Sequence, residues 1–288
     1  MIRSLAKRLL FNANLFFAKK LGLTDELRCS QELSKIDVSK YSKIVVLAPH
    51  PDDETIGCAS ILEESVKSSR TVEVVLVTGS DSRLDETRSA ISEISSRDIR
   101  ITFLGYKDGE VYRSQHDLEK SLIELFGNDI EDTCFFVPYI YDFHSDHIGS
   151  TIAFLRAFSS RTSLLNAYMY RTNHANIMED FDSYLEVDCG LKTKMYNHFQ
   201  SQGSLNFEAL SSIRRIYKSY SKVKEVELFR RICAKDKFVD LTKLEYFEDI
   251  EGKVSDIHPI YFLRNSRKAS SAVSDATDKG LGISYASS

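Results

Sequence analysis

Four short apolar runs, each followed by a polar turn and a helix-like stretch, constrain the fold of this 288-residue chain more than any other feature. Their β-branched and aromatic residues favour short buried strands at 44–47, 72–77, 101–104 and 134–137. Mixed three- and four-residue spacing of apolar residues predicts helices at 55–66, 85–95 and 118–126. The alternation predicts an α/β fold, a Rossmann-like three-layer sandwich whose mainly parallel sheet has helices on both faces.

The rest of the chain has weaker patterns. We expect helices at 148–158, 192–201 and 207–232, and strands at 166–170 and 184–187. A single domain is expected at 41–264, preceded by a helical segment at 1–40. Residues 265–288 are rich in Ser and Ala and have few large apolar groups, so this tail is expected to be disordered.

Composition argues for a small-molecule partner. The formal net charge is -4, and no block of Lys and Arg lies beside aromatic residues, so we expect no binding of nucleic acid. The five cysteines form no CxxC pair, which favours reduced thiols and a reducing compartment. The chain has neither a run approaching the roughly 20 apolar residues of a membrane span nor the uninterrupted apolar stretch of a signal peptide, so we expect a cytoplasmic protein.

The N-terminal residues 1–23 combine large apolar residues with five basic and no acidic ones; the apolar residues include Leu5, Leu9, Leu10, Phe11, Leu15, Phe16 and Phe17. This composition suits peripheral contact with the inner face of an anionic membrane. The alternative is a helix that packs on the body of the domain, because apolar helix faces more often belong to a core.

Two polar clusters follow two of the predicted strands. His50-Pro51-Asp52-Asp53-Glu54 comes after the first run, and Asp142-Phe143-His144-Ser145-Asp146-His147 comes after the fourth. Ligands of open α/β sheets bind at the carboxyl ends of strands. The predicted fold therefore brings both clusters to one edge of the sheet, without any appeal to function.

The residue types in these clusters suit a catalytic metal. A catalytic zinc ion has three His, Asp or Glu ligands and leaves a fourth position for water, whose pKa it lowers toward ~7. His50 and Asp53 can face one point across the turn, while Asp52 can approach the bound water. Two neutral imidazoles suit zinc better than the hard ion of a magnesium phosphoesterase, although iron or cobalt would accept the same ligands.

Each feature also has a plain structural interpretation. Asp52 and Asp53 could cap a helix, and each histidine could be a polar loop residue. Both clusters at the carboxyl ends of parallel strands favour the metal site. Glu54 is expected to hold the turn.

The two motifs also carry a resemblance. Ala48-Pro49-His50-Pro51-Asp52-Asp53-Glu54, with Gly57-Cys58 downstream and His144-Ser145-Asp146-His147 later, resembles the PIG-L/LmbE family of zinc-dependent N-deacetylases. This family removes acetyl groups from N-acetylglucosamine-type substrates. Similarity covers roughly residues 43–230 and extends to Arg83-Leu84-Asp85-Glu86, Phe103-Leu104-Gly105-Tyr106 with Asp108-Gly109 and, more faintly, Ser201-Gln202 and Glu227-Leu228-Phe229.

The resemblance implies a role for each site residue. It implies that Zn²⁺ is bound by His50, Asp53 and His147, and that Asp52 is the general base. His144, oriented by Asp146, would stabilise the oxyanion or protonate the departing amine. Arg83 and Asp108 resemble the substrate-contacting positions of the family, although a solvated charge and a turn aspartate explain them equally well.

The implied activity is hydrolysis of the acetamide of an N-acetylated amino sugar, such as a lipid-linked or nucleotide-linked N-acetylglucosamine conjugate. Many relatives have an acidic residue soon after the second strand, whereas this chain has Thr78-Gly79-Ser80-Asp81. The resemblance therefore does not assign the residues of this part of the sugar pocket. The alternatives are a zinc amidase on a non-sugar amide or thiol conjugate, and a non-catalytic carbohydrate-binding homologue. The presence of both Asp52 and His144 speaks against the last of these.

Overall fold

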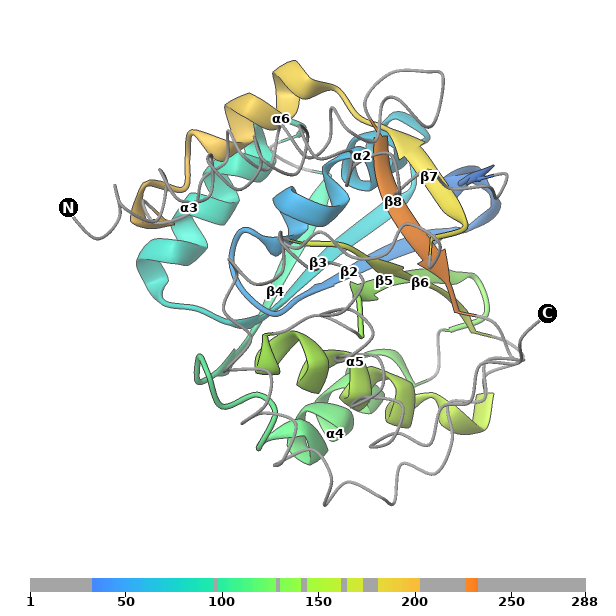
Figure 1. The fold of residues 1–288 in the computed structure, drawn as a ribbon, viewed down its shortest axis with the longest axis vertical. Helices are drawn as coiled ribbons and strands as arrows, with labels where there is room; N and C mark the ends of the chain where they lie inside the picture. Colours follow the sequence, from blue (N-terminus) through green and yellow to red (C-terminus); the bar gives the residue numbers. More distant parts are fainter. Residues whose placement is uncertain are drawn as a thin grey trace, which may run out of the picture.

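The structure is a computed structural model that describes residues 33–95, 98–127, 130–140, 144–161, 165–172, 181–202 and 226–232. Within these residues one eight-stranded sheet has the strand order β1-β7-β8-β6-β5-β2-β3-β4 (Figure 1). The strands are β1 Ser34–Lys35, β2 Lys43–Ala48, β3 Thr71–Thr78, β4 Ile99–Tyr106, β5 Thr133–Pro138, β6 Asn166–Tyr170, β7 Ser183–Glu186 and β8 Val226–Arg231. All neighbouring pairs are parallel except the two that involve β8.

The predicted α/β class and its mainly parallel sheet are confirmed. The four apolar runs form β2, β3, β4 and β5, and the two weaker strand predictions correspond to β6 and β7. Along the chain, β2, β3 and β4 are laid down in one direction, after which β5 returns to the other side of β2. The strand order therefore reverses between β2 and β5, the place where open α/β sheets bind ligands.

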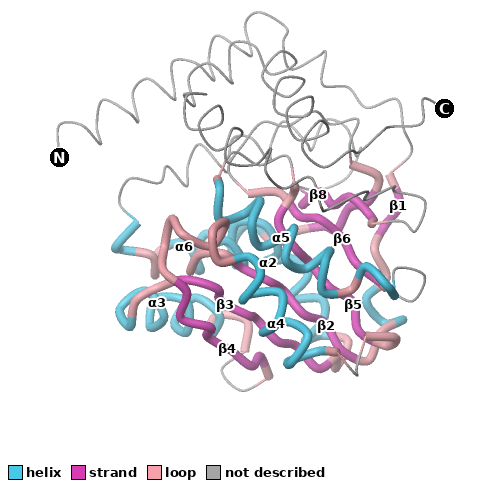
Figure 2. Tube along the Cα trace, turned by 90° about the horizontal axis from the view of Figure 1, so that it is seen from below, coloured by secondary structure: helices cyan, strands magenta, loops and turns pink. Residues whose placement is uncertain are grey.

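Helices cover both faces of this sheet. They are α2 Asp53–Lys67, α3 Asp81–Ser92, α4 Gln115–Phe126, α5 Ser145–Ala157 and α6 Cys189–Tyr196, with short 3-10 turns at Val38–Lys40, Ser159–Arg161 and Gln200–Gln202. Figure 1 shows α2, α3 and α6 on one side of the strands and α4 and α5 on the other. The view from below in Figure 2 has α4 and α5 in front of the strand layer. The arrangement has three layers, as predicted.

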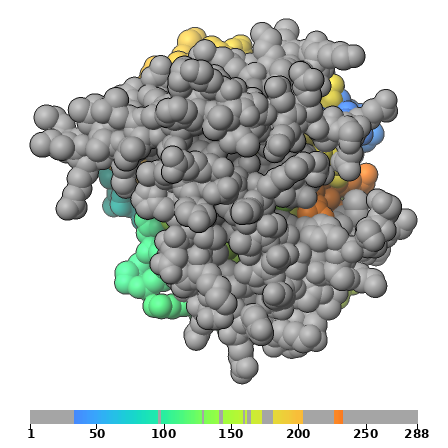
Figure 3. Space-filling view, viewed as in Figure 1, coloured from blue at the N-terminus to red at the C-terminus, as the bar shows by residue number. Residues whose placement is uncertain are grey.

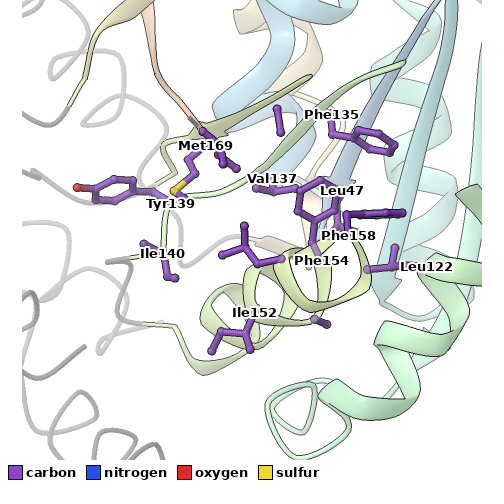
Figure 4. Close-up of a cluster of buried hydrophobic side chains, with 14 of the residues drawn as sticks. Leu47, Leu122, Phe135, Val137, Tyr139, Ile140, Ile152, Phe154, Phe158 and Met169 are labelled. Carbon is purple, nitrogen blue, oxygen red and sulfur yellow. The ribbon is translucent and has the colours of Figure 1, made fainter. Parts of the chain in front are cut away.

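The two faces of the sheet bury separate groups of side chains. Beneath α4 and α5, Phe135 packs edge-on against Phe126. It also contacts Phe154 and Phe158 (Figure 4). On the other face, residues of α2 pack on Ile44, Val46 and other side chains of β2 and its neighbours. Since β2 is buried on both faces, it reads as a continuous apolar run and not as an alternating one.

The helix predicted at 207–232 is wrong over Val226–Arg231, because these residues form β8 between β6 and β7. The segment mixes apolar residues with Glu227, Arg230 and Arg231 and has no clean two-residue alternation, so it resembled the end of a helix. Part of β8 is visible at the surface in the space-filling view (orange, Figure 3), and Arg231 in its last position is exposed. Residues 203–225 lie outside the described residues.

The sheet also begins earlier than the expected domain start at residue 41. β1 pairs with β7, and Ile36 and Val38 are buried in the core. The proposed membrane-contact segment at 1–23 and the tail at 265–288 lie outside the described residues. Among the residues that are described, no helix is long and apolar enough to cross a membrane.

Candidate active site

Five strands of the sheet deliver the candidate site at their carboxyl ends. His50 follows β2, Arg83 lies on the helix after β3, and Asp108 follows β4. His144, Asp146 and His147 start the helix after β5, and Thr172 follows β6. All eight site residues predicted from the sequence are described, and contacts between them connect them into one cluster.

The turn after β2 is strained and braced from within. Asp52 has φ 131°, in the region that favours glycine, and strain of this kind costs about 1–3 kcal/mol. The backbone N–H of Asp52 donates to Oε2 of Glu54 at 3.0 Å, and the hydroxyl of Thr55 donates to Oε1 of Glu54 at 2.9 Å. The fully buried Glu54 thus holds the turn, in line with its expected structural role.

Three potential ligand atoms form a nearly equilateral triangle. Nδ1 of His50 lies 3.2 Å from Oδ2 of Asp53 and 3.2 Å from Nε2 of His147, and these last two atoms are 3.1 Å apart. His50, Asp53 and His147 are 8%, 1% and 3% exposed, so the triangle is shielded from water. Its atoms belong to the three residues expected to bind zinc.

The triangle fits a tetrahedral metal. With metal–nitrogen distances of about 2.0–2.1 Å, the ligand atoms of tetrahedral zinc are about 3.3 Å apart, close to the separations found here. Two other groups, His50 with His144 and His147, and His50 with Asp108 and Asp146, place their ligand atoms within 4.8 Å of one another. We favour the triangle, in which all three separations are 3.1–3.2 Å.

The other edge of the His50 ring faces carboxylates. Its Nε2 lies 3.1 Å from Oδ2 of Asp146 and 3.2 Å from Oδ1 of Asp108. A proton on Nε2 satisfies these carboxylates and leaves the Nδ1 lone pair available to a metal, as in carboxylate–histidine–zinc arrangements. Asp146 also accepts from the backbone N–H of Gly109 at 2.7 Å and of Val111 at 3.1 Å, so it fixes the loop that carries Asp108.

The partner of Asp146 differs from the predicted one. We expected this carboxylate to orient His144, whereas its contact here is with His50. The connection to His144 runs through the backbone, since the N–H of Asp146 donates to Nδ1 of His144 at 3.3 Å. An accepting Nδ1 places the proton of the neutral His144 ring on Nε2.

Arg83 joins the carboxylates outside the triangle. Its guanidinium lies 3.6 Å from Oδ2 of Asp52 and 3.7 Å from Oδ2 of Asp108, and it donates to the carbonyl of Pro51 at 3.0 Å. The side-chain oxygen of Gln202, in the orientation that pairs donors with acceptors, accepts from Arg83 Nε and Nη2 at 2.8 Å. Arg83 is therefore held in place and is not a freely solvated charge.

Thr172 was not singled out from the sequence. Its hydroxyl lies 3.4 Å from Nδ1 of His147, opposite the ring nitrogen that faces the triangle. A single threonine in the short stretch after β6 carries no sequence signal. Only the pairing of β6 with β5 brings Thr172 to the site.

The charges of the cluster suit a cation at the triangle. Burial opposes protonation of His50, but the carboxylates of Asp108, Asp146 and Asp53 outweigh it and raise the pKa of His50 well above its ordinary range. Burial works against ionisation of Asp53 as well, yet contact with His147 and His50 lowers the pKa of Asp53. The hydrogen bond with His50 lowers the pKa of Asp108 to about 2. A metal ion that displaces these protons would be attracted by the same carboxylates.

Asp52 differs from its neighbour. Burial, followed by the negative charges of Asp53 and Glu54, raises the pKa of Asp52 well above its usual range. The pKa values of two adjacent aspartates are therefore shifted in opposite directions. This arrangement is expected where one carboxylate binds a metal and the other accepts a proton.

Comparison with solved structures supports the fold. A conserved protein TT1542 from Thermus thermophilus matches with a TM-score of 0.54 and 20% identity over 66% of this chain and 94% of its own. The N,N'-diacetylchitobiose deacetylase from Pyrococcus horikoshii matches with a TM-score of 0.50 and 18% identity over 67% and 84%. GalB, the 4-carboxy-2-hydroxymuconate hydratase from Pseudomonas putida KT2440, matches with a TM-score of 0.50 and 10% identity over 67% and 97%. At these identities the likeness concerns the fold alone.

Comparison with families is more specific. No protein of curated function matches the chain. The model of the PIG-L family, described as GlcNAc-PI de-N-acetylase, matches residues 45–158. This segment contains every site residue predicted from the sequence, and the resemblance to the PIG-L family is thereby confirmed over it.

Proposed function

We propose that the chain is a zinc-dependent N-deacetylase that hydrolyses the acetamide of an N-acetylated amino sugar. The observation that carries the proposal is the triangle of Nδ1 of His50, Oδ2 of Asp53 and Nε2 of His147, with edges of 3.1–3.2 Å. The PIG-L match over residues 45–158 supports the substrate class.

These three residues would hold Zn²⁺. When bound there, the ion would polarise the amide carbonyl and lower the pKa of a water molecule. Hydrogen bonds to outer residues hold the imidazoles in place: Nε2–H of His50 would donate to Asp146, and Nδ1–H of His147 would donate to the hydroxyl oxygen of Thr172.

Asp52 is proposed as the general base. It lies next to Asp53, the residue is 4% exposed, and its carboxylate is near the Arg83 guanidinium. In the reaction, the water oxygen forms a bond to the acetyl carbon while Asp52 takes a water proton. The C–N bond then breaks, and the amine leaves with a proton, giving acetate and the free amino sugar.

His144 is proposed to act on the opposite side of the scissile bond. Its exposed ring lies edge-on to His50 with 4.5 Å between ring centroids, and Nε2 carries the proton when Nδ1 accepts from Asp146. From there it can donate to the developing oxyanion or to the departing nitrogen. Arg83 and Asp108 are proposed to contact the sugar or the group attached to it.

The test is acetate release from a panel of N-acetylglucosamine conjugates and non-sugar amides by zinc-loaded protein, with metal content measured. Asp52→Asn keeps the size of the side chain and should lose at least a hundredfold in kcat while it retains zinc. Release from non-sugar amides alone would favour the amidase alternative. Zinc binding without hydrolysis of any amide would favour a carbohydrate-binding protein, and failure to bind a transition metal would refute the proposal.

A further inference from the structure

The helix that carries Asp53 is kinked shortly after its start. Within α2, Cys58 has φ -134° and ψ 16°, which are not helical values. In a regular helix the N–H of Ser60 would donate to the carbonyl of Ile56, four residues earlier. In this chain both groups have partners from other elements of the fold.

A buried ion pair supplies those partners. Nζ of Lys192 in α6 donates to the carbonyl of Ile56 at 2.6 Å. Oε2 of Glu227 in β8 accepts from the backbone N–H of Ser60 at 2.9 Å and from its hydroxyl at 2.6 Å. Lys192 and Glu227 also contact each other directly. One ion pair thus satisfies the donor and the acceptor on the two sides of the kink.

Burying these charges is costly. Lys192 is 0% exposed and Glu227 is 5% exposed. A buried ion pair often adds nothing to stability compared with apolar side chains of the same volume, because removing charges from water offsets their attraction. A contribution to overall stability therefore explains the buried pair poorly. Its hydrogen bonds to the Ile56 carbonyl and the Ser60 N–H at the kink explain its position specifically.

The kink lies close enough to the start of α2 to affect the position of Asp53 in the candidate active site. Only the residues from Asp53 to Gly57 precede it, so the break sets the direction of the turn that presents Asp53. Figure 1 shows α6 and β8 near α2, and both elements contact it. Neither Lys192 nor Glu227 contributes an atom to the His50, Asp53 and His147 triangle.

We propose that Lys192 and Glu227 are positioning residues, a clamp that holds the kink of α2 open and thereby aims Asp53 at the metal position. The inference rests on the proposed function only in naming zinc as the ion. Without the clamp, the Ser60 N–H and the Ile56 carbonyl would pair with each other, α2 would straighten, and the carboxylate of Asp53 would leave the triangle.

The test compares three paired variants of the full chain by zinc affinity, measured by chelator competition without any substrate. Lys192→Met with Glu227→Met should fold, with zinc affinity reduced at least tenfold, in the range found for lost outer-shell partners. Lys192→Gln with Glu227→Gln keeps an amide donor for Ile56 and an acceptor for Ser60, so it should stay within about threefold of the wild-type affinity. Lys43→Met with Glu73→Met removes another ion pair, remote from the kink, and should leave the affinity unchanged.

Visible absorption of the Co²⁺-loaded proteins reports coordination geometry and should change in the Met pair and recover in the Gln pair. If the Met pair fails to fold, Lys192→Met with Glu227→Gln takes its place, since it keeps the acceptor for Ser60 and loses only the donor to Ile56. Wild-type zinc affinity and Co²⁺ spectrum in a folded variant without that donor would overturn the proposal. Because neither measurement needs turnover, failure of the clamp is distinguishable from failure of the deacetylase assignment.

Discussion

Asp146 accepts from Nε2 of His50 at 3.1 Å, a contact between side chains 96 residues apart in the sequence. The same carboxylate accepts from the N–H groups of Gly109 and Val111, so one buried side chain connects the turns after β2, β4 and β5. A proton on Nε2 that faces this carboxylate would leave Nδ1 of His50 available to a metal.

Replacement of Asp146 by Asn should therefore weaken zinc binding. The carboxylate accepts from three donors, namely Nε2–H of His50 and the backbone N–H groups of Gly109 and Val111. An amide offers these donors only one oxygen, and its NH₂ group must face at least one of them. We expect zinc affinity to fall about 10- to 100-fold, as for other outer partners of ligating histidines. Chelator competition measures this, with Asp117→Asn on the exposed face of α4 as the matched control. Unchanged affinity would mean that the carboxylate does not set the His50 tautomer.

Replacement of His144 distinguishes between two possible sets of metal ligands, one with this histidine and one without it. Replacement by Gln should lower kcat by about 10²–10⁴-fold, the usual range for an acid–base residue, with zinc stoichiometry unchanged. Metal analysis beside acetate assays checks both effects, and His116→Gln, an exposed change on α4, is the control. Loss of zinc from the His144 variant would assign it to the ligand set with His50 and His147.

Gly57 lets α2 approach the end of β6. A Cβ at this position would lie 2.1 Å from Cδ2 of Tyr170 and 2.8 Å from the carbonyl oxygen of Arg171. Gly57→Ala should destabilise the fold by about 1–3 kcal/mol, because crowding outweighs the gain in helix propensity. Urea unfolding measures this. Gly190→Ala in α6, where only Oδ1 of Asp188 comes within 4 Å, should change stability far less, and equal effects would rule out the crowding argument.

Glu73 should contribute pH-dependent stability. Burial opposes its ionisation, but Thr102 and Lys43, whose Nζ lies 2.9 Å from Oε2, outweigh burial and lower the pKa of Glu73. A lowered folded-state pKa means that the contribution is full above the unfolded value of about 4.3 and is lost as pH falls through the folded value.

Glu73→Gln should therefore be less stable than the wild type at pH 7, and the difference should shrink as the pH falls below about 4. Urea midpoints across this pH range measure the effect, with Glu124→Gln at an exposed position of α4 as the control. A difference that is constant with pH would show that hydrogen bonding alone, and not charge, carries the interaction.

The sequence alone determined the class of fold and indicated eight residues of the candidate site. Buried parallel strands must be apolar on both faces, so β2, β3 and β5 stand out as continuous runs between amphipathic helices. The polar clusters that follow two of them must then meet at one edge. Those requirements are local, and for this reason 44–47 and 134–137 could be assigned without coordinates.

Only the tertiary structure decided which atoms meet. The strand β8 could not be recognised because its six residues mix apolar and charged side chains without the two-residue alternation of a strand, and only pairing with β6 and β7 decides its conformation. Likewise, Asp146 reaches His50 and Lys192 reaches Ile56 across 96 and 136 residues. No spacing in the sequence encodes such contacts, because the register of the sheet and the packing of α6 on α2 create them.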